Sequence, residues 1–181
     1  ETVDVGTEPN WLGGEGWYDN TRLAHPTDPN VVFVGGVNLA RINLSGTNRT
    51  TTFIGGGTHP DHHGLVAINA PGGWRILNTN DGGVSVSTLV DAGFTQLVDG
   101  MVTTQFYGGD KRPGASAYAG GTQDNTTLNG PSRTLTDHGA SNLDWITTWG
   151  GNGFHTLAEP GNPNIVYSTL QHGVLAKKKK K

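Results

Sequence analysis

The sequence predicts an all-β protein, a β-propeller of about four blades. Two observations lead to this fold class: the composition, and the recurrence of one strand-forming pattern along the chain. The 181 residues include 29 Gly, 23 Thr and 15 Asn but only 4 Glu. Thr favours strands, whereas Gly and Asn favour tight turns. The composition therefore predicts many short strands joined by turns.

The recurrence is seen in four segments that share a polar turn followed by a short apolar run. They are residues 29–36, 73–78, 115–121 and 163–168. Aligning them places Asn38, Asp81, Asp124 and His172 in register, at offsets of 43, 43 and 48 residues. A unit of 40–50 residues with three or four strands is typical of one propeller blade. Gly and Asn inside nearly every window argue against helical units, so another β-sandwich or barrel is the remaining alternative.

Each of these segments has a further strand-like stretch before it. These stretches are residues 17–21, 61–66, 103–107 and 153–157, and residues 84–87 and 94–98 follow as additional strands. The same alignment brings Asp19, Asp61, Thr104 or Gln105, and Asn152 roughly into register. We therefore expect repeats near 16–58, 59–101, 102–149 and 150–176.

The fourth repeat lacks an outer strand, because only five lysines, residues 177–181, follow Ala176. Propellers close with typically four to eight blades. We therefore expect a partial ring that closes by homo-oligomerisation, or a fragment of a longer propeller. We interpret the lysines as an artificial or solubilising tail, with a polyanion-binding tail as the alternative.

Charge and composition exclude several partners. Without the lysine tail, seven basic residues face 15 acidic ones, a net charge of −8, so we expect no nucleic-acid partner. No apolar run approaches the ~20 residues of a membrane span, so we expect no membrane partner. The chain has no Cys, which excludes disulfides and thiolate chemistry.

Several of these strings together resemble the sortilin-type, BNR-repeat (Asp-box) glycosyl-hydrolase-like propellers of secreted bacterial proteins. They are residues 16–21, 24–36, 59–63, 80–84, 104–109, 121–125, 150–154 and 163–167. The Asp-box turn of that family is degraded here, with only traces at 45–53 and 91–95, and Asn152 stands where relatives often carry Asp. The resemblance implies an extracellular protein that acts on or binds carbohydrate. Because the family is diverse, it leaves open a glycoside hydrolase, a non-catalytic sortilin-like binding scaffold for a glycan or protein, or a metal-binding propeller.

Carboxylates are the candidates for hydrolytic chemistry. Asp19 and Asp61 occupy equivalent positions in adjacent repeats, and glycoside hydrolysis commonly needs two carboxylates. We therefore predict Asp19 and Asp61 as catalytic acid and base. Asp81 and Asp124 form a second equivalent pair, although both stand in good turn sequences.

A divalent metal site is the alternative use of this region. If residues 59–63 form a strand, His59, Asp61 and His63 share one face and His62 points the other way. Two imidazoles and a carboxylate could bind zinc or, less well, calcium. A structural role, capping a turn and bonding to a neighbouring repeat, stays open for the same residues.

Aromatic and polar side chains in or near the repeats are the candidates for substrate binding. Sugar rings lie on aromatic side chains while nearby polar groups fix their orientation. The candidates are Trp17, Tyr18, His62, Gln105, Tyr107, Asp124, Trp149 and Asn152. The alternative for the aromatic residues is a place in the core between blades.

Overall fold

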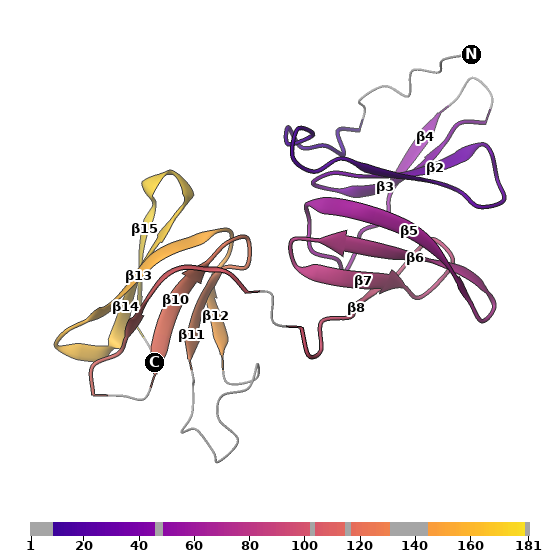
Figure 1. Cartoon of the computed structure of the whole chain (residues 1–181). Coiled ribbons are helices and arrows are strands. Elements are labelled where there is room, and N and C mark those ends of the chain that lie inside the picture. Colours follow the sequence, from indigo (N-terminus) through magenta and orange to yellow (C-terminus); the bar gives the residue numbers. More distant parts are fainter. Residues whose placement is uncertain (1–8, 46–48, 102–103, 115–116, 131–144, 180–181) are drawn as a thin grey trace. The chain divides into compact units, whose positions relative to one another are not determined.

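The computed structural model describes residues 9–45, 49–101, 104–114, 117–130 and 145–179. In this part of the chain the regular structure is strand, apart from a short 3₁₀ turn at Gln171–Gly173. The chain divides into two compact units, Glu1–Met101 and Val102–Lys181, shown in Figure 1. This division falls where the sequence analysis separates the second repeat from the third.

The first unit contains two four-stranded sheets. Sheet 1 has the order β1 (Thr21–Ala24), β2 (Val31–Gly35), β3 (Leu39–Asn43) and β4 (Thr50–Phe53). Sheet 2 has the order β5 (His62–Ala70), β6 (Gly73–Asn80), β7 (Gly83–Ser87) and β8 (Phe94–Gln96). Strands that follow one another in sequence therefore pair with one another, and all pairs are antiparallel.

The second unit also contains two antiparallel sheets. Sheet 3 joins β9 (Phe106–Lys111), β10 (Tyr118–Thr122), β11 (Thr127–Gly130) and β12 (Ile146–Trp149). Sheet 4 joins β13 (Gly153–Glu159), β14 (Asn162–Leu170) and β15 (Leu175–Lys179). The all-β prediction is confirmed, and no sheet among the described residues closes on itself.

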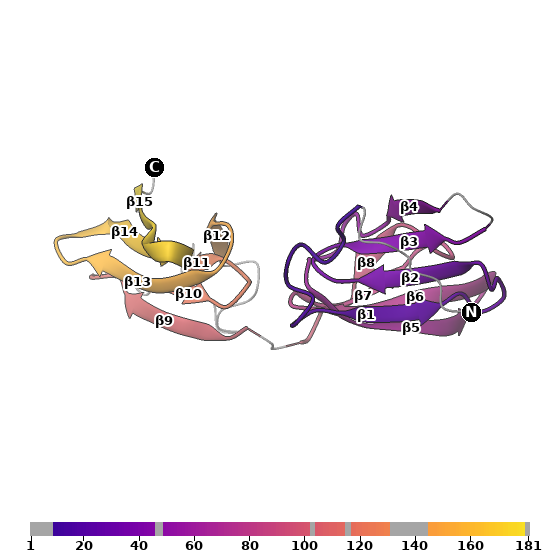
Figure 2. The same ribbon diagram turned by 90° about the horizontal axis from the view of Figure 1, so that it is seen from above.

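The positions aligned in the sequence have equivalent places in the four sheets. Asn38, Asp81, Asp124 and His172 each lie in the connection between the second and third strands of a sheet. Asp19, Asp61, Gln105 and Asn152 each stand just before the first strand. Within each unit, the first strands of the two sheets lie against each other: β1 contacts β5, and β9 contacts β13 (Figure 2).

A shared hydrophobic core joins sheets 1 and 2. Its buried members are Val31, Phe33, Leu39, Leu65 and Ile76. Trp74 packs against this cluster and meets the ring of Phe33 edge-on, with centroids 5.8 Å apart. Trp11 packs against a second buried cluster of sheet 1, formed by Val34, Ala40 and Ile42. Burial of these side chains, at roughly 25 cal/mol per Å² of apolar surface, stabilises the pairing of the two sheets.

Small residues make the junction between sheets 3 and 4. A Cβ added at Gly121 in β10 would lie 1.9 Å from the carbonyl oxygen of Phe154 in β13, so only glycine fits there. Buried side chains at this junction are short, as with Ala119 and Thr156. The side chain of Arg112 donates hydrogen bonds to the carbonyl of Pro163 and to Asn129, which ties the two sheets together.

Three expectations about strand limits are corrected. Residues 17–20, expected to be strand, form a turn, because the amides of Tyr18 and Asp19 both donate to the carbonyl of Glu15. Residues 59–61 precede β5, and Asp61 adopts a left-handed φ of 61°, which breaks the expected alternation. At the other end of the chain, Lys177–Lys179 belong to β15 and pair with β14.

Parts of the predicted segments lie outside the described residues. They are residues 46–48 of the first repeat, residues 102–103 and 131–144 of the third repeat, residues 115–116 of its apolar segment, and Lys180 and Lys181 of the lysine run. Among the described residues, no helix has the length and apolar character needed to cross a membrane.

Candidate carboxylate and aromatic site

The candidate site forms where two segments, the one before β1 and the start of β5, both bond to the short turn Gly36–Asn38 between β2 and β3. On one side, the amide of Asn38 donates to the carbonyl of Trp11, which anchors the segment before β1. On the other side, the amide of His62 donates to the carbonyl of Gly36 at 2.8 Å. The turn thereby brings the segment before β1 next to the start of β5.

Glu15, Asp19 and Asp61 meet at this junction. One carboxylate oxygen from each lies within 4.8 Å of the others. Glu15 is exposed, Asp61 is half-buried and Asp19 is fully buried. The structure thus brings the predicted pair Asp19 and Asp61 together and adds a third carboxylate.

Asp61 is the member of the cluster whose ionisation is disfavoured by its surroundings. Burial, and then the neighbouring charges of Asp19, Asp81 and Glu15, raise the pKa of Asp61 from 3.8 to about 6, against a smaller opposing effect of His59. Like charges and desolvation both disfavour the ionised carboxylate. At neutral pH Asp61 is still mostly ionised, so the cluster concentrates negative charge.

Asp19 is the unusual member of this cluster. Its side chain has no exposed surface, and neither carboxylate oxygen has a hydrogen-bond partner among the described residues. Buried polar groups in proteins are nearly always hydrogen-bonded, so such a carboxylate requires an explanation.

The three histidines of this region each contact other groups. The buried His62 ring is hydrogen-bonded to Asn78 Oδ1 at 2.9 Å. Burial lowers the pKa of His62 despite that bond, so the ring is neutral at pH 7. His63 Nε2 lies 2.5 Å from Asp81 Oδ1. His59 Nδ1 lies 3.1 Å from the carbonyl oxygen of Pro60. The structure therefore does not assemble His59, Asp61 and His63 into one group of ligands.

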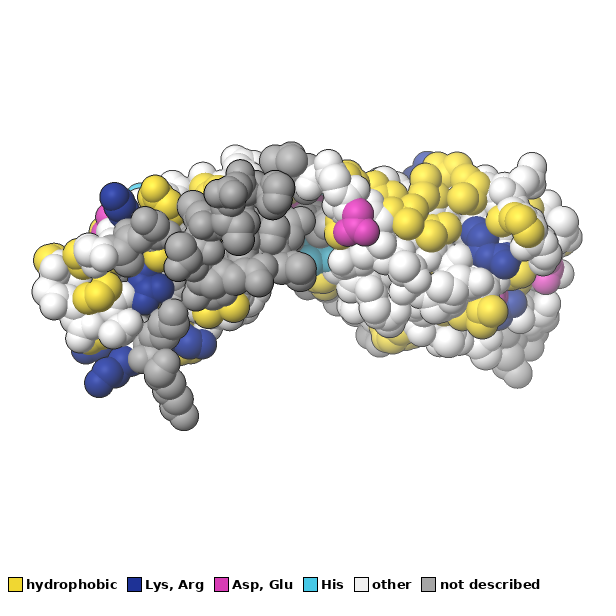
Figure 3. All heavy atoms as spheres, turned by 90° about the horizontal axis from the view of Figure 1, so that it is seen from below, with side chains coloured by type: hydrophobic (Ala, Val, Ile, Leu, Met, Phe, Trp, Pro, Cys, Tyr) yellow, Lys and Arg dark blue, Asp and Glu magenta, His cyan; other side chains and the backbone are white. Residues whose placement is uncertain are grey.

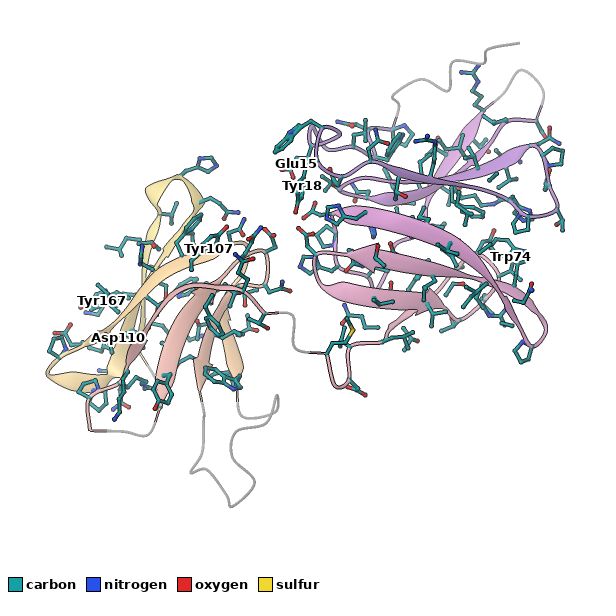
Figure 4. The ribbon with its side chains drawn as sticks, in the orientation of Figure 1. Glu15, Tyr18, Trp74, Tyr107, Asp110 and Tyr167 are labelled. Atoms are coloured by element: carbon teal, nitrogen blue, oxygen red, sulfur yellow. The ribbon has the colours of Figure 1, made fainter. Side chains whose placement is uncertain are left out.

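Two exposed aromatic side chains lie beside the carboxylates. Trp17 is 85% exposed, and its ring centroid lies 5.6 Å from that of Tyr18, which is 45% exposed. Tyr18 also meets the His63 ring edge-on at 4.9 Å. Figure 4 shows Glu15 and Tyr18 close together on the segment before β1, with Trp74 at the opposite end of β5 and β6.

A hollow of about 300 Å³ adjoins the same junction. It is lined on one side by Asn38 and on the other by Pro60 and His62, which flank Asp61 in the chain. Its lining also includes the apolar side chains of Leu39 and Phe53. The hollow lies at the lower end of the volume range of small-molecule sites.

The predicted residues of the second unit gather at the equivalent junction of sheets 3 and 4. The amide of Asp124 donates to Asn152 Oδ1 at 2.5 Å, and the amide of Gln123 donates to the carbonyl of Gln105 at 2.9 Å. Here Gln105 and Asn152 stand where the first unit has Asp19 and Asp61. At these two equivalent positions the second unit therefore carries neutral side chains.

The two predicted aromatic residues of the second unit are held differently. Tyr107 stacks on Phe154 with centroids 4.8 Å apart, so one face of its ring is occupied. Trp149 is half-buried, and its indole nitrogen is buried without a hydrogen-bond partner among the described residues.

Glu15 is the site residue that sequence reasoning missed. It lies outside the repeat alignment and four positions before Asp19. Its rarity and its neighbours were the available signals. Glu15 is one of only four Glu residues, and it stands between Gly14 and Gly16, two positions before Trp17.

Comparison with known proteins adds no assignment. No family model matches the sequence, and no curated protein matches it. The function is therefore argued from the residues at the junction of sheets 1 and 2.

Proposed function

We propose that the chain forms blades of a β-propeller and binds carbohydrate where sheets 1 and 2 meet. The observation that carries the binding proposal is the exposed Trp17 and Tyr18 pair beside the carboxylates of Glu15 and Asp61. Aromatic faces stack on sugar rings, while charged oxygens accept hydrogen bonds from sugar hydroxyls. The partner is therefore a glycan or polysaccharide.

Three features support the propeller. Sheets 1 to 3 are four-stranded antiparallel meanders, the architecture of a blade. In all four sheets, the positions aligned in the sequence lie at the same two places: just before the first strand, and in the connection between the second and third strands. Within each unit, the first strand of one sheet contacts the first strand of the next.

The surface of the first unit suits a polar, uncharged ligand. Figure 3 shows that neutral polar side chains and backbone cover much of the face of this unit that it presents, with separate hydrophobic patches and few charges. Only 15% of the residues in the chain are charged. A glycan recognised by stacking and hydrogen bonds needs no dense field of charge.

A glycan array followed by Trp17→Ala tests the binding proposal. We expect the full chain to bind a defined set of glycans and Trp17→Ala to lose them, because this ring offers the largest exposed aromatic surface at the site. Since Trp17 is 85% exposed, the substitution should change stability by no more than about 0.5 kcal/mol. If no glycan on the array is bound, or if Trp17→Ala binds the same glycans as the wild type, the proposal is rejected and a protein-binding scaffold is favoured.

A glycoside hydrolase is the second candidate, favoured by the separation of the carboxylates. Glu15 and Asp61 are the members reachable from solvent, because Asp19 is fully buried. An oxygen of each lies within 4.8 Å of an oxygen of the other, and the two carboxyl groups of retaining enzymes are also close together, roughly 5 Å apart. Asp61→Asn should then abolish release of reducing sugar from a polysaccharide without lowering the melting temperature, and a variant that retains turnover rejects the assignment.

A further inference from the structure

The carboxylate cluster of Glu15, Asp19 and Asp61 carries an excess of negative charge, since His59 opposes but does not cancel the effects of Asp19, Asp81 and Glu15 on Asp61. The ion pairs of Arg41 with Asp91 and of His63 with Asp81 include no member of the cluster. The chain has no Lys or Arg before Arg22.

The burial and bonding of the Asp19 side chain indicate which kind of group completes the cluster. Its side chain is fully buried and directs an oxygen toward Glu15 and Asp61, yet both of its oxygens lack a hydrogen-bond partner among the described residues. A buried carboxylate without a partner costs more free energy than a neutral polar group left unsatisfied. A bound cation would satisfy Asp19 and cancel the repulsion among the three carboxylates together.

We propose that Glu15, Asp19 and Asp61 bind a calcium ion. The donors are all oxygen atoms, the ligands that hard divalent cations prefer, whereas zinc favours nitrogen and sulfur. Calcium accepts carboxylate oxygens at about 2.4 Å, so two ligands on opposite sides of the ion are about 4.8 Å apart. The three oxygens of the cluster lie within that span.

The ion would fix the aromatic pair in place. Trp17 and Tyr18 lie in the chain between two of the ligands, Glu15 and Asp19, on a turn closed by hydrogen bonds to the Glu15 carbonyl. Asp61, the third ligand, stands at the start of sheet 2. Calcium would therefore tie the turn that carries the aromatic residues to the neighbouring sheet.

Calcium binding by this cluster is a property beyond the binding of carbohydrate, and it is tested without any glycan. The full chain is treated with a chelator, and calcium binding is measured by isothermal titration calorimetry and thermal unfolding. At a concentration of calcium about 100-fold above Kd, we expect the melting temperature of the first unit to rise by at least about 5 °C. Absence of both binding heat and a thermal shift overturns the proposal.

Two substitutions assign the response to the cluster. Asp19→Asn should lose the calcium shift and, in chelator, unfold at the same temperature as the wild type or higher, because it removes a repelled buried charge. Asp99→Asn, at an exposed carboxylate of the same unit, is the matched control and should respond like the wild type. Should Asp19→Asn fail to fold, Glu15→Gln replaces it, since Glu15 is exposed and its substitution should weaken calcium binding at least tenfold.

The same thermal-shift measurement with magnesium and with zinc distinguishes a calcium site from other metal sites. Calcium should give the largest shift of the three ions. A zinc response that His63→Ala removes and Asp19→Asn leaves intact would overturn the proposal in favour of a histidine site. Saturating calcium would also occupy the carboxylates that hydrolysis needs, so Asp61-dependent polysaccharide turnover that saturating calcium leaves undiminished would overturn the proposal as well.

Discussion

The carboxylate of Asp19 lies within 4.8 Å of that of Asp61, although one residue precedes the first strand of sheet 1 and the other the first strand of sheet 2. Their proximity follows from the turn Gly36–Asn38, which bonds to both segments. Equivalent places in two adjacent sheets thus become one site.

Gly121→Ala should strongly destabilise the second unit. The added methyl group would overlap the carbonyl oxygen of Phe154, and backbone cannot yield as a flexible side chain can. We expect a loss of at least about 2 kcal/mol, within the range for overpacked cores, measured by denaturant unfolding. Gly161→Ala, where a Cβ meets nothing within 4 Å, should be nearly neutral, and equal effects of the two substitutions would contradict the close approach of the sheets.

Asn78→Ala should destabilise the first unit. The buried amide of Asn78 joins the His62 ring at the start of β5 to the hydroxyl of Ser85 in β7. Its removal leaves both partners buried and unsatisfied, at a cost of roughly 1–3 kcal/mol for each group that stays unpaired. Thermal unfolding measures the effect.

The control for Asn78 lies on the same sheet. Asn69 is exposed on β5, so Asn69→Ala should change the free energy of unfolding by no more than about 0.5 kcal/mol. If Asn78→Ala were as mild, the buried polar contacts beside the site would not stabilise the junction.

The chain should self-associate. Sheet 4 has three strands among the described residues, one fewer than each of the other sheets, and β15 has no second strand neighbour there. An unpaired edge strand is a template for pairing with another chain. Light scattering coupled to size-exclusion chromatography should give a dimer or larger species, and a monomer at all concentrations would contradict a ring completed between chains.

The sequence predicted the strands well where the local pattern matched the final pairing. The apolar runs at 31–35 and 73–80 are strands β2 and β6 because their alternating side chains fill the core between sheets 1 and 2. The turn positions Asn38, Asp81, Asp124 and His172 could also be placed, since Gly, Asn and Asp mark turns by local chemistry.

The site was less accessible to sequence reasoning, because its geometry depends on contacts across the fold. Asp61 has a left-handed φ, so the expected strand alternation of His59, Asp61 and His63 does not hold. Glu15 joins Asp19 and Asp61 only because the turn Gly36–Asn38 bonds to Trp11 on one side and His62 on the other. No spacing rule encodes that pair of contacts.

The aromatic residues beside the carboxylate cluster are the proposed binding surface for carbohydrate. The most direct measurement is isothermal titration calorimetry of the best glycan ligand against Tyr18→Ala and Tyr118→Ala, two tyrosines of nearly equal exposure, at 45% and 48%. Loss of one stacking ring at the site should weaken binding about tenfold, a change of about 1.4 kcal/mol. We predict that loss for Tyr18→Ala with wild-type affinity for Tyr118→Ala, and equal affinities for the two variants would contradict the account.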